Sequence, residues 1–185
     1  MKEDLIMVYI LLAPGFEEME ALVPADLLRR AGVETALVSL EGEYVPGGHD
    51  IVVKADLELA HIELDKARMI VLPGGGVGVA NLGADPRVEE LVKEAARQGR
   101  KLAAICAAPS LLSKWGLLEG KQAVCYPTWR DKVPGCVFRE GEKLAEDGNT
   151  VTGQAAGASF EFGLKLVEVL TDADTAQRVR KEICL

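Results

Sequence analysis

Four short stretches of this 185-residue chain are mostly apolar: residues 5–12, 33–40, 69–72 and 102–105. The first is apolar on both of the faces that a strand presents, which is typical of a strand buried between helices in a parallel sheet. Helical patterns separate or follow these stretches, at residues 17–30, 86–98, 158–170 and 175–182. This alternation predicts an α/β fold with a mostly parallel sheet and helices on both of its faces.

Shorter elements complete the predicted order. We expect strands at residues 51–54 and 123–126, a helical turn at 62–67, a helix at 110–115 and a hairpin at 143–153. In open parallel sheets, binding and catalytic sites lie at the carboxyl ends of the strands. Three unusual segments of the sequence follow strands in this way: residues 14–20, residues 74–78 and the residues around Cys106.

The composition is that of an ordinary globular protein, with 49% hydrophobic and 27% charged residues. We expect residues 1–185 to form one domain, because no linker, repeat or low-complexity stretch divides them. The net charge of −8 argues against a nucleic-acid partner, since nucleic-acid phosphates bind to a basic face. Residues 5–13 are too short to span a membrane, and their acidic flanks differ from those of a signal peptide, so we expect a cytoplasmic protein without a membrane partner.

The residues with metal-binding or redox chemistry are four cysteines and two histidines: Cys106, Cys125, Cys136, Cys184, His49 and His61. The cysteines form no C-x-x-C pair, and no group of them has the spacing of a zinc site. We therefore expect free thiols, with neither a metal nor a cofactor. A free cysteine is most often a small buried apolar residue, so a reactive role must be supported by its surroundings in the chain.

The surroundings of Cys106 do support such a role. The apolar stretch 102–105 ends at Cys106, the small residues Ala107 and Ala108 follow, and a helical pattern then begins with Pro109 in its first turn. This order of strand, sharp turn and helix predicts a nucleophile elbow. In an elbow of this kind, the partial positive charge of the helix N-terminus favours the thiolate form of the cysteine.

A glycine run, Gly74-Gly75-Gly76-Val77-Gly78, follows the third apolar stretch. It lacks the lysine and serine or threonine of a P-loop, and the dinucleotide fingerprint is incomplete. Two interpretations remain open from the residues alone. The run is a tight turn that requires glycine, or it is such a turn whose exposed N–H groups also line an oxyanion site.

Glu20 shares one arc of a helical wheel with four apolar residues: Phe16, Met19, Val23 and Leu27. Glu18 falls on the opposite side of that wheel. A buried carboxyl has a raised pKa, so it keeps its proton near neutral pH and donates a hydrogen bond. A donor of this kind stabilises a nearby thiolate. The alternative is that the Glu20 side chain reaches solvent from the first turn of the helix.

Several motifs, taken in order along the chain, carry a resemblance to a known family. They are Gly15-Phe16-Glu17-Glu18-Met19-Glu20, Val23-Pro24-Ala25-Asp26, Arg29-Arg30-Ala31-Gly32, Val71-Leu72-Pro73-Gly74-Gly75, Asn81-Leu82, Ala103-Ala104-Ile105-Cys106-Ala107-Ala108-Pro109 and Ser159-Phe160-Glu161-Phe162. The chain resembles the ThiJ/PfpI superfamily nearly end to end, and it is most similar to its DJ-one-like branch. The resemblance implies a flavodoxin-like three-layer sandwich and, commonly, a homodimer.

The resemblance also implies roles for individual residues. Cys106 matches the family's nucleophile, and Glu20 matches the glutamate that hydrogen-bonds it. Gly75 and Ala107 match the residues whose backbone N–H groups form an oxyanion hole. Three further positions are expected to line the pocket: Gly74, Tyr126 and His49.

The chain departs from the family pattern at two of these positions. Relatives place a histidine before a proline after the elbow helix, whereas this chain has Tyr126 before Pro127. Tyrosine has an ordinary pKa of about 10, so it is a poor general base at neutral pH. A closely related branch carries arginine near the position of His49, which changes the charge of the pocket.

Three functional hypotheses follow from the resemblance. In the first, the chain is a cofactor-free enzyme whose Cys106 thiolate acts on methylglyoxal, glyoxal or their adducts. In the second, it is a redox or stress-response protein without turnover, in which peroxide oxidises Cys106 to a sulfinate. The third is a hydrolase or amidase of the wider superfamily, for which the residues supply no obvious general base.

Overall fold

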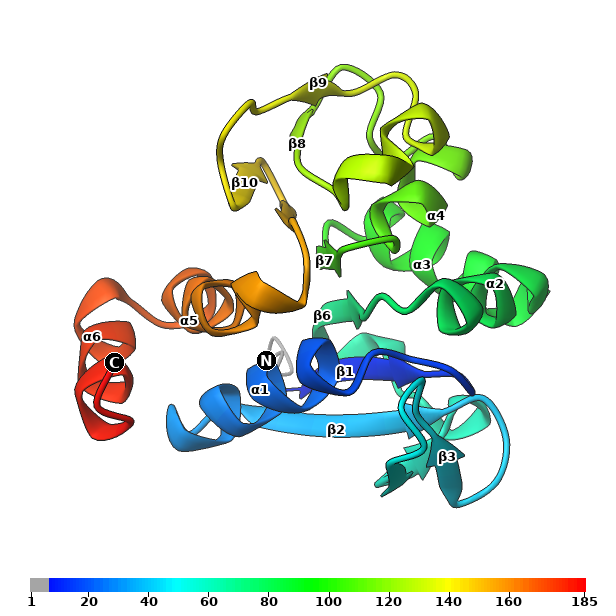
Figure 1. Cartoon of the computed structure of the whole chain (residues 1–185). Helices are drawn as coiled ribbons and strands as arrows, with labels where there is room; N and C mark the ends of the chain where they lie inside the picture. Colours follow the sequence, from blue (N-terminus) through cyan, green and yellow to red (C-terminus); the bar gives the residue numbers. More distant parts are fainter. Residues whose placement is uncertain (1–6) are drawn as a thin grey trace.

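The computed structural model describes residues 7–185, and its centre is one seven-stranded sheet (Figure 1). The strand order across the sheet is β10-β11-β7-β6-β1-β2-β5. In chain order these strands are β1 (Met7–Leu12), β2 (Glu34–Ser39), β5 (Leu57–Glu58), β6 (Ala67–Leu72), β7 (Lys101–Ile105), β10 (Leu144–Asp147) and β11 (Thr150–Gly153). Residues 5 and 6 of the first predicted strand lie outside the described residues.

The neighbouring strands of this sheet are parallel, except that β10 is antiparallel to β11. The pairing of β10 with β11 confirms the predicted hairpin, and its turn contains Gly148 with a φ of 58°. The parallel pairing brings the carboxyl ends of β1, β6, β7 and β11 to one edge of the sheet. The prediction of a mostly parallel α/β sheet is therefore confirmed.

Six α-helices are described: α1 (Glu18–Arg30), α2 (Gly76–Ala84), α3 (Pro86–Arg97), α4 (Pro109–Lys114), α5 (Ser159–Leu170) and α6 (Ala173–Glu182). Figure 1 shows α5 and α6 together at one end of the molecule and α2, α3 and α4 together at the other. Short 3₁₀ helices cover Leu59–His61 (η1), Leu64–Lys66 (η2), Pro127–Lys132 (η3) and Ala156–Ala158 (η4). None of the helices among residues 7–185 is both long and apolar enough to cross a membrane.

Side chains of β1 alternate between two apolar cores, one on each face of the sheet. Tyr9 and Leu11 belong to the core that α2, α3 and α4 cover. Val8, Ile10 and Leu12 belong to the core that α1 and α5 cover. Because successive strand residues point to opposite faces, a strand that is apolar at every position requires helices on both sides. The two cores make the molecule a three-layer sandwich.

The packing of α1 on α5 depends on Gly163. A Cβ atom at that position would lie 2.7 Å from Leu27 Cδ1 and 3.0 Å from the Cα of Pro24. A glycine in α5 therefore lets the two helices approach closely beneath the segment that carries Glu20. Pro24 itself lies inside the continuous helix α1.

Two parts of the predicted order differ in the structure. Residues 123–126 were expected to form a strand, but only Gln122–Ala123 (β8) is extended, and it pairs with Val137–Phe138 (β9) outside the main sheet. The backbone N–H of Val124 donates to the Thr152 hydroxyl at 2.9 Å, so it does not pair with the backbone of a neighbouring strand. Helix α2 was not predicted, because four of residues 74–78 are glycine.

The other short elements are close to their predicted places. Strand β4 covers Val52–Lys54 and pairs with β3 (Tyr44–Pro46), which the sequence did not predict. The helical turn expected at 62–67 is the 3₁₀ helix η2, and its last expected residue, Ala67, begins β6 instead.

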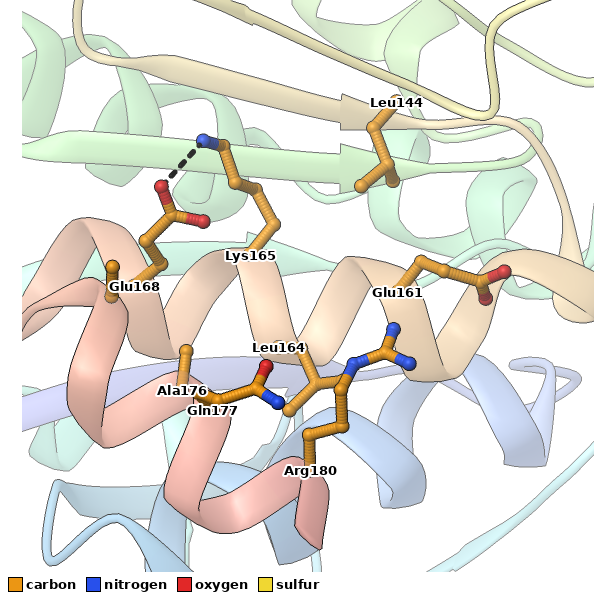
Figure 2. A pocket seen from close by; sticks show the side chains of 9 residues that line it. Leu144, Glu161, Leu164, Lys165, Glu168, Ala176, Gln177 and Arg180 are labelled. Carbon is orange, nitrogen blue, oxygen red and sulfur yellow. Dashed lines mark hydrogen bonds and ion pairs between the residues drawn. The ribbon is translucent and has the colours of Figure 1, made fainter. Parts of the chain in front are cut away.

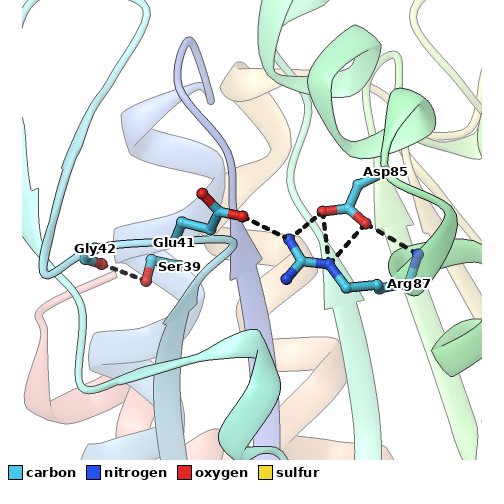
Figure 3. A network of polar contacts seen from close by, with 5 residues as sticks. All are labelled: Ser39, Glu41, Gly42, Asp85 and Arg87. Carbon is cyan, nitrogen blue, oxygen red and sulfur yellow. Dashed lines mark hydrogen bonds and ion pairs between the residues drawn. The ribbon is translucent and has the colours of Figure 1, made fainter.

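Polar contacts hold the loops at the carboxyl edge of β1 and β2. Arg87 bonds Asp85 at 2.6 Å and Glu41, in the loop after β2, at 3.3 Å. Asp85 also caps α3 by accepting the N–H of Arg87 at 2.9 Å. Figure 3 shows this network together with the Ser39 hydroxyl, which donates to the Gly42 carbonyl oxygen. The network lies next to the loop after β1, since Pro14 lines a crevice together with Glu41, Asp85 and Arg87.

Candidate active site

Three loops meet at the carboxyl edge of the sheet: residues 13–17 after β1, residues 73–75 after β6 and residues 106–108 after β7. Backbone hydrogen bonds tie the first two, since Glu17 N donates to Gly74 O at 3.0 Å and Gly78 N donates to Gly15 O at 3.0 Å. The three segments that the sequence analysis singled out are thus neighbours in space, as the parallel topology requires.

Cys106 occupies a strained turn. Its φ is 65°, in the left-handed region that few residues other than glycine adopt. Its N–H donates to Gly153 O at 3.0 Å, and its carbonyl oxygen accepts the N–H of Tyr126 at 2.8 Å. Such a conformation costs about 1–3 kcal/mol, and it persists only where the surrounding bonds enforce it. The predicted elbow geometry is confirmed, with the thiol half-buried at the end of β7.

The Glu20 side chain is fully buried in the first turn of α1. Its Oε2 accepts the N–H of Gly74 at 2.8 Å, and its carboxyl hydrogen-bonds the thiol of Cys106. Among the described residues, Oε1 has no nitrogen or oxygen partner. The alternative of a solvent-reaching Glu20 is therefore wrong, and the buried carboxyl faces the sulfur.

The glycine turn contributes both close approach and backbone donors. Gly75 has a φ of 87°, and a Cβ atom there would lie 2.7 Å from the nitrogen of Glu17. The N–H groups of Gly75 and Ala107 both hydrogen-bond the sulfur of Cys106. A Cβ atom on Gly74 would overlap the Glu20 carboxyl and lie 2.6 Å from Cys106 Cβ. The run is therefore a tight turn that requires glycine and that also presents an N–H group to the sulfur, and its use as an oxyanion site stays a prediction.

Burial is the main influence on both titrating groups. It raises the pKa of Glu20 to about 7, and the nearby Glu17 carboxylate adds to the rise. Burial also raises the pKa of the Cys106 thiol, to about 12, with further increases from the charge of Glu20 and from its hydrogen bond. The N–H groups of Gly75 and Ala107 act in the opposite direction. The sequence analysis expected the helix N-terminus to lower this pKa, but α4 is only six residues long and these larger effects outweigh it.

Glu20 and Cys106 are best described as a pair that shares protons. While Glu20 is ionised, its charge opposes a thiolate beside it. When Glu20 keeps its proton, that repulsion is absent and the carboxyl donates its hydrogen bond to sulfur. A thiolate is therefore stabilised in the state that has one proton on Glu20 and none on Cys106.

Glu18 and His49 form a second pair, which the sequence analysis did not predict. Glu18 is only 4% exposed, whereas Met19, expected on the buried arc, is 46% exposed. The helical wheel was wrong for these two residues because the turn at Gly47 and Gly48 folds over the start of α1. Glu18 accepts hydrogen bonds from the backbone N–H of His49 at 2.7 Å and from its ring Nδ1 at 2.8 Å.

This pairing changes the pKa of both residues. Burial pushes the pKa of Glu18 upward, but the hydrogen bonds from His49 outweigh it and lower that pKa overall. The hydrogen bond and charge of Glu18 raise the pKa of His49. The His49 side chain is 71% exposed, so the residue lies at the surface of the molecule.

A cavity of about 360 Å³ lies between His49 and the glycine turn after β6. Its walls include Glu17, His49, Gly75 and Gly76. Glu17, Glu18 and His49 each place one metal-binding atom within 4.8 Å of the others. The hydrogen bonds between Glu18 and His49 already use these atoms, so the arrangement is explained without an ion.

Tyr126 meets the elbow through its backbone. Its N–H donates to the carbonyl oxygen of Cys106, it directly precedes the 3₁₀ helix η3, and the residue is 41% exposed. The position expected for the family's histidine is thus beside Cys106, and the residue there carries a phenol in place of an imidazole.

This fold and site define a flavodoxin-like α/β protein with a cysteine at a strand-to-helix elbow. The chain belongs to the DJ-1/PfpI family, whose model matches residues 7–169. It is 37% identical over 174 residues to Protein dj-1beta of Drosophila melanogaster, with 93% of each chain covered. The crystal structure of Drosophila melanogaster DJ-1beta superimposes with a TM-score of 0.93 at 35% identity and 97% coverage of each chain.

Two other relatives have informative names. The chain is 30% identical over 179 residues to Glutathione-independent glyoxalase DJR-1.2 of Caenorhabditis elegans, with 95% of each chain covered. The structure named Toxoplasma gondii DJ-1, oxidized, has a TM-score of 0.91 at 33% identity, with 96% of this chain and 97% of that chain covered. Aldehyde-related activity is therefore present within the family.

The shared protons of Glu20 and Cys106 lead to a pH prediction. The rate at which iodoacetamide alkylates Cys106 should rise as the pH passes through about 7, where the pair loses its first proton, and then level off. In Glu20→Gln this step should disappear, because the amide has no proton to lose and the thiol titrates alone. Mass spectrometry of the Cys106 peptide measures the rate. A step of unchanged size and position in Glu20→Gln would contradict the shared-proton description.

Proposed function

We propose that the chain is a cysteine-dependent, cofactor-free enzyme that acts on small reactive aldehydes. It converts methylglyoxal or glyoxal to the hydroxy acid, or removes the adducts that these aldehydes form. The observation that carries this proposal is the set of groups around one sulfur: the Glu20 carboxyl and the N–H groups of Gly75 and Ala107. The similarity to a protein named as a glutathione-independent glyoxalase supports the choice of substrate.

The first step is addition of the sulfur to the aldehyde. Glu20 keeps its proton while the Cys106 thiolate attacks the aldehyde carbon, and the electron pair of the C=O bond moves to oxygen. The N–H groups of Gly75 and Ala107 stabilise the oxyanion as it forms. Glu20 then gives its proton to that oxygen, which forms a hemithioacetal and leaves Glu20 as a carboxylate.

The second step moves hydrogen between the two substrate carbons. The former aldehyde carbon loses its hydrogen as a proton to the Glu20 carboxylate or to water, and a proton returns to the adjacent carbon. A group with a pKa of about 7 both accepts and donates protons at neutral pH, which suits Glu20 to this role. The product is a thioester of the 2-hydroxy acid. Water then cleaves the carbon–sulfur bond, releases the acid and restores the thiol, so the overall reaction adds one water molecule.

The active form in this proposal is a homodimer. Apolar side chains that remain exposed on the single chain support it: Met19 in α1, Phe160 in α5, and Ile51 and Val52 at β4. Exposed apolar surface of this kind is typical of protein interfaces.

A second candidate function is oxidation of Cys106 without turnover. The relative from Toxoplasma gondii has a structure named as oxidized, which favours this alternative. In this proposal two peroxide molecules convert the thiol to a sulfinic acid and are reduced to water. The hydrogen bonds from Glu20, Gly75 and Ala107 then hold the sulfinate oxygens.

Replacement of the sulfur tests the enzyme proposal directly. Cys106→Ser should lower kcat/KM for lactate formation from methylglyoxal by at least about a hundredfold, because a hydroxyl is a much weaker nucleophile than a thiolate. Cys184→Ser, at an exposed cysteine away from the site, is the matched control and should leave the rate unchanged. Equal rates for the wild type and Cys106→Ser would end the proposal.

Tyr126 offers a gain-of-function test. Tyr126→His places an imidazole beside Cys106 and should raise kcat about tenfold or more, since a positioned general base contributes about 10²–10⁴-fold. Tyr126→Phe should change kcat by less than about threefold, because a phenol is not the base at neutral pH. A large loss of activity in Tyr126→Phe would instead show that the hydroxyl takes part in the reaction.

Mild peroxide treatment tests the alternative. Peptide mass spectrometry should find sulfinate at Cys106 before it is found at Cys125, Cys136 or Cys184, and Glu20→Gln should accumulate less of it. Oxidation spread evenly over the four cysteines would count against a sensing role for Cys106.

A further inference from the structure

A second polar site lies at the opposite edge of the sheet from Cys106. It is a crevice of about 470 Å³ at the amino ends of β7 and β11, lined by Arg100, Lys121, Asn149 and residues around them. Cys106 follows the carboxyl end of β7, so the sheet separates the two sites. The residues that line this crevice include two cations and no acidic side chain.

Arg100 has hydrogen-bond donors that the described protein leaves unused. Its Nη2 donates to the Gln98 side-chain oxygen at 3.1 Å and to the Asp65 carbonyl oxygen at 3.4 Å, both of which are neutral acceptors. Its Nε is buried and has no hydrogen-bond partner among residues 7–185. An acceptor from outside the chain can reach the guanidinium at Nη1, which is not among the buried atoms and makes no hydrogen bond within residues 7–185.

Lys121 is the second cation, and it is half-buried in the same crevice. The contact of its ammonium group is with the Asp147 carbonyl oxygen at 3.5 Å, at the far limit of a hydrogen bond. Within the described part of the chain, no carboxylate lies within ion-pair distance of Arg100 or Lys121. The two nearest acidic residues, Asp65 and Asp147, approach these cations through their backbone oxygens.

Two unpaired cations in one crevice are unusual for this chain, which has 29 acidic and 21 basic residues. A crevice of about 370 Å³ between β10, α5 and α6 shows the contrast (Figure 2). Its Lys165 forms ion pairs with Glu146 at 2.8 Å and with Glu168 at 3.3 Å, so this lysine is not free to bind an anion. Arg87, in the network of Figure 3, is likewise paired with two carboxylates.

The backbone around Arg100 is held in place before any ligand arrives. Asn149, in the turn before β11, fixes it, because its side chain donates to Gly99 O at 3.2 Å and its carbonyl oxygen accepts the N–H of Leu102 at 2.8 Å. Leu102 and Leu117 add apolar walls. A fixed guanidinium and ammonium pair beside apolar surface suits a dianion that carries a small organic group.

We propose that this crevice binds a phosphate dianion, either as free phosphate or as the phosphate group of a small phosphorylated compound. Arg100 donates from its Nη1 and Nη2 groups to two phosphate oxygens, and Lys121 neutralises the second charge. A carboxylate, with one negative charge, would leave one of the two cations unpaired. The site is independent of Cys106 and of the proposed aldehyde reaction.

Calorimetric titration of the full chain with inorganic phosphate and with glycerol 3-phosphate tests this proposal. Saturable binding is expected, and amide NMR signals of Gly148 and Gly116 should shift with it. Arg100→Gln and Lys121→Gln should each weaken binding about tenfold, the loss of one charge-assisted contact. Arg100→Lys should fall between Arg100→Gln and the wild type, because it keeps the charge but loses the planar fork.

Lys181→Gln is the matched control, because it removes one charge from an exposed position on α6 and should change affinity by less than about twofold. Tighter binding of the ester than of inorganic phosphate identifies a phosphorylated compound as the source, and the reverse identifies free phosphate. Absence of saturable binding by folded wild-type chain overturns the proposal. Equal affinity in wild type, Arg100→Gln and Lys121→Gln overturns it as well.

Discussion

The buried Glu20 carboxyl is the constraint around which the carboxyl edge of the sheet is organised. An ionised carboxylate without compensation is costly in such a place, so the site supplies the Gly74 N–H and leaves the proton on Glu20 at near-neutral pH. Gly74 has no room for a side chain, since any Cβ atom would overlap that carboxyl. In this buried site the Glu20 carboxyl lies beside the Cys106 thiol, so the ionisation of each group depends on the other. Strand topology, the glycine turn and the reactivity of the thiol are linked through this one carboxyl.

The surroundings of the sulfur distinguish this chain from the pattern that the family resemblance implies. A phenol stands where a histidine is expected, and an imidazole pairs with the buried Glu18 at the edge of a neighbouring cavity. Proton transfer in the proposed reaction therefore falls to Glu20, whose pKa of about 7 suits it to act as both acid and base. His49 is linked to this region by charge, because Glu17 lies 4.0 Å from the His49 ring and raises the pKa of Glu20.

Opposite edges of the same sheet carry opposite kinds of polar site. At the carboxyl edge, the start of α1 carries three acidic residues, Glu17, Glu18 and Glu20, of which Glu20 hydrogen-bonds the Cys106 thiol. At the amino edge, Arg100 and Lys121 share a crevice without an acidic lining residue. The net charge of −8 therefore describes the whole surface but not the local potential in this crevice. An acidic chain thus still presents a small basic pocket.

The sequence by itself determined the α/β class, the order of the main strands and the elbow at Cys106. These follow from local pattern, because a strand that is apolar on both faces must be buried on both, and a strand that ends in small residues before a proline must turn. It also placed Glu20 on a buried arc, because Phe16 and Leu27 share that arc. The order of motifs was enough to indicate the family.

Only the tertiary structure decided which neighbours each of these residues meets. The turn at Gly47 and Gly48 buries Glu18 and leaves Met19 exposed. A helical wheel of α1 cannot show this, because the turn comes from another segment of the chain. The direction of the pKa shift at Cys106 depends on its distance from Glu20 and on shared burial, and these outweigh the short helix α4. Arg100, directly before β7, and Lys121, directly before β8, are 21 residues apart in the sequence and come together only in the folded chain, where they line one crevice. Local patterns report which face is buried, whereas the partner on that face is set by the packing of distant segments.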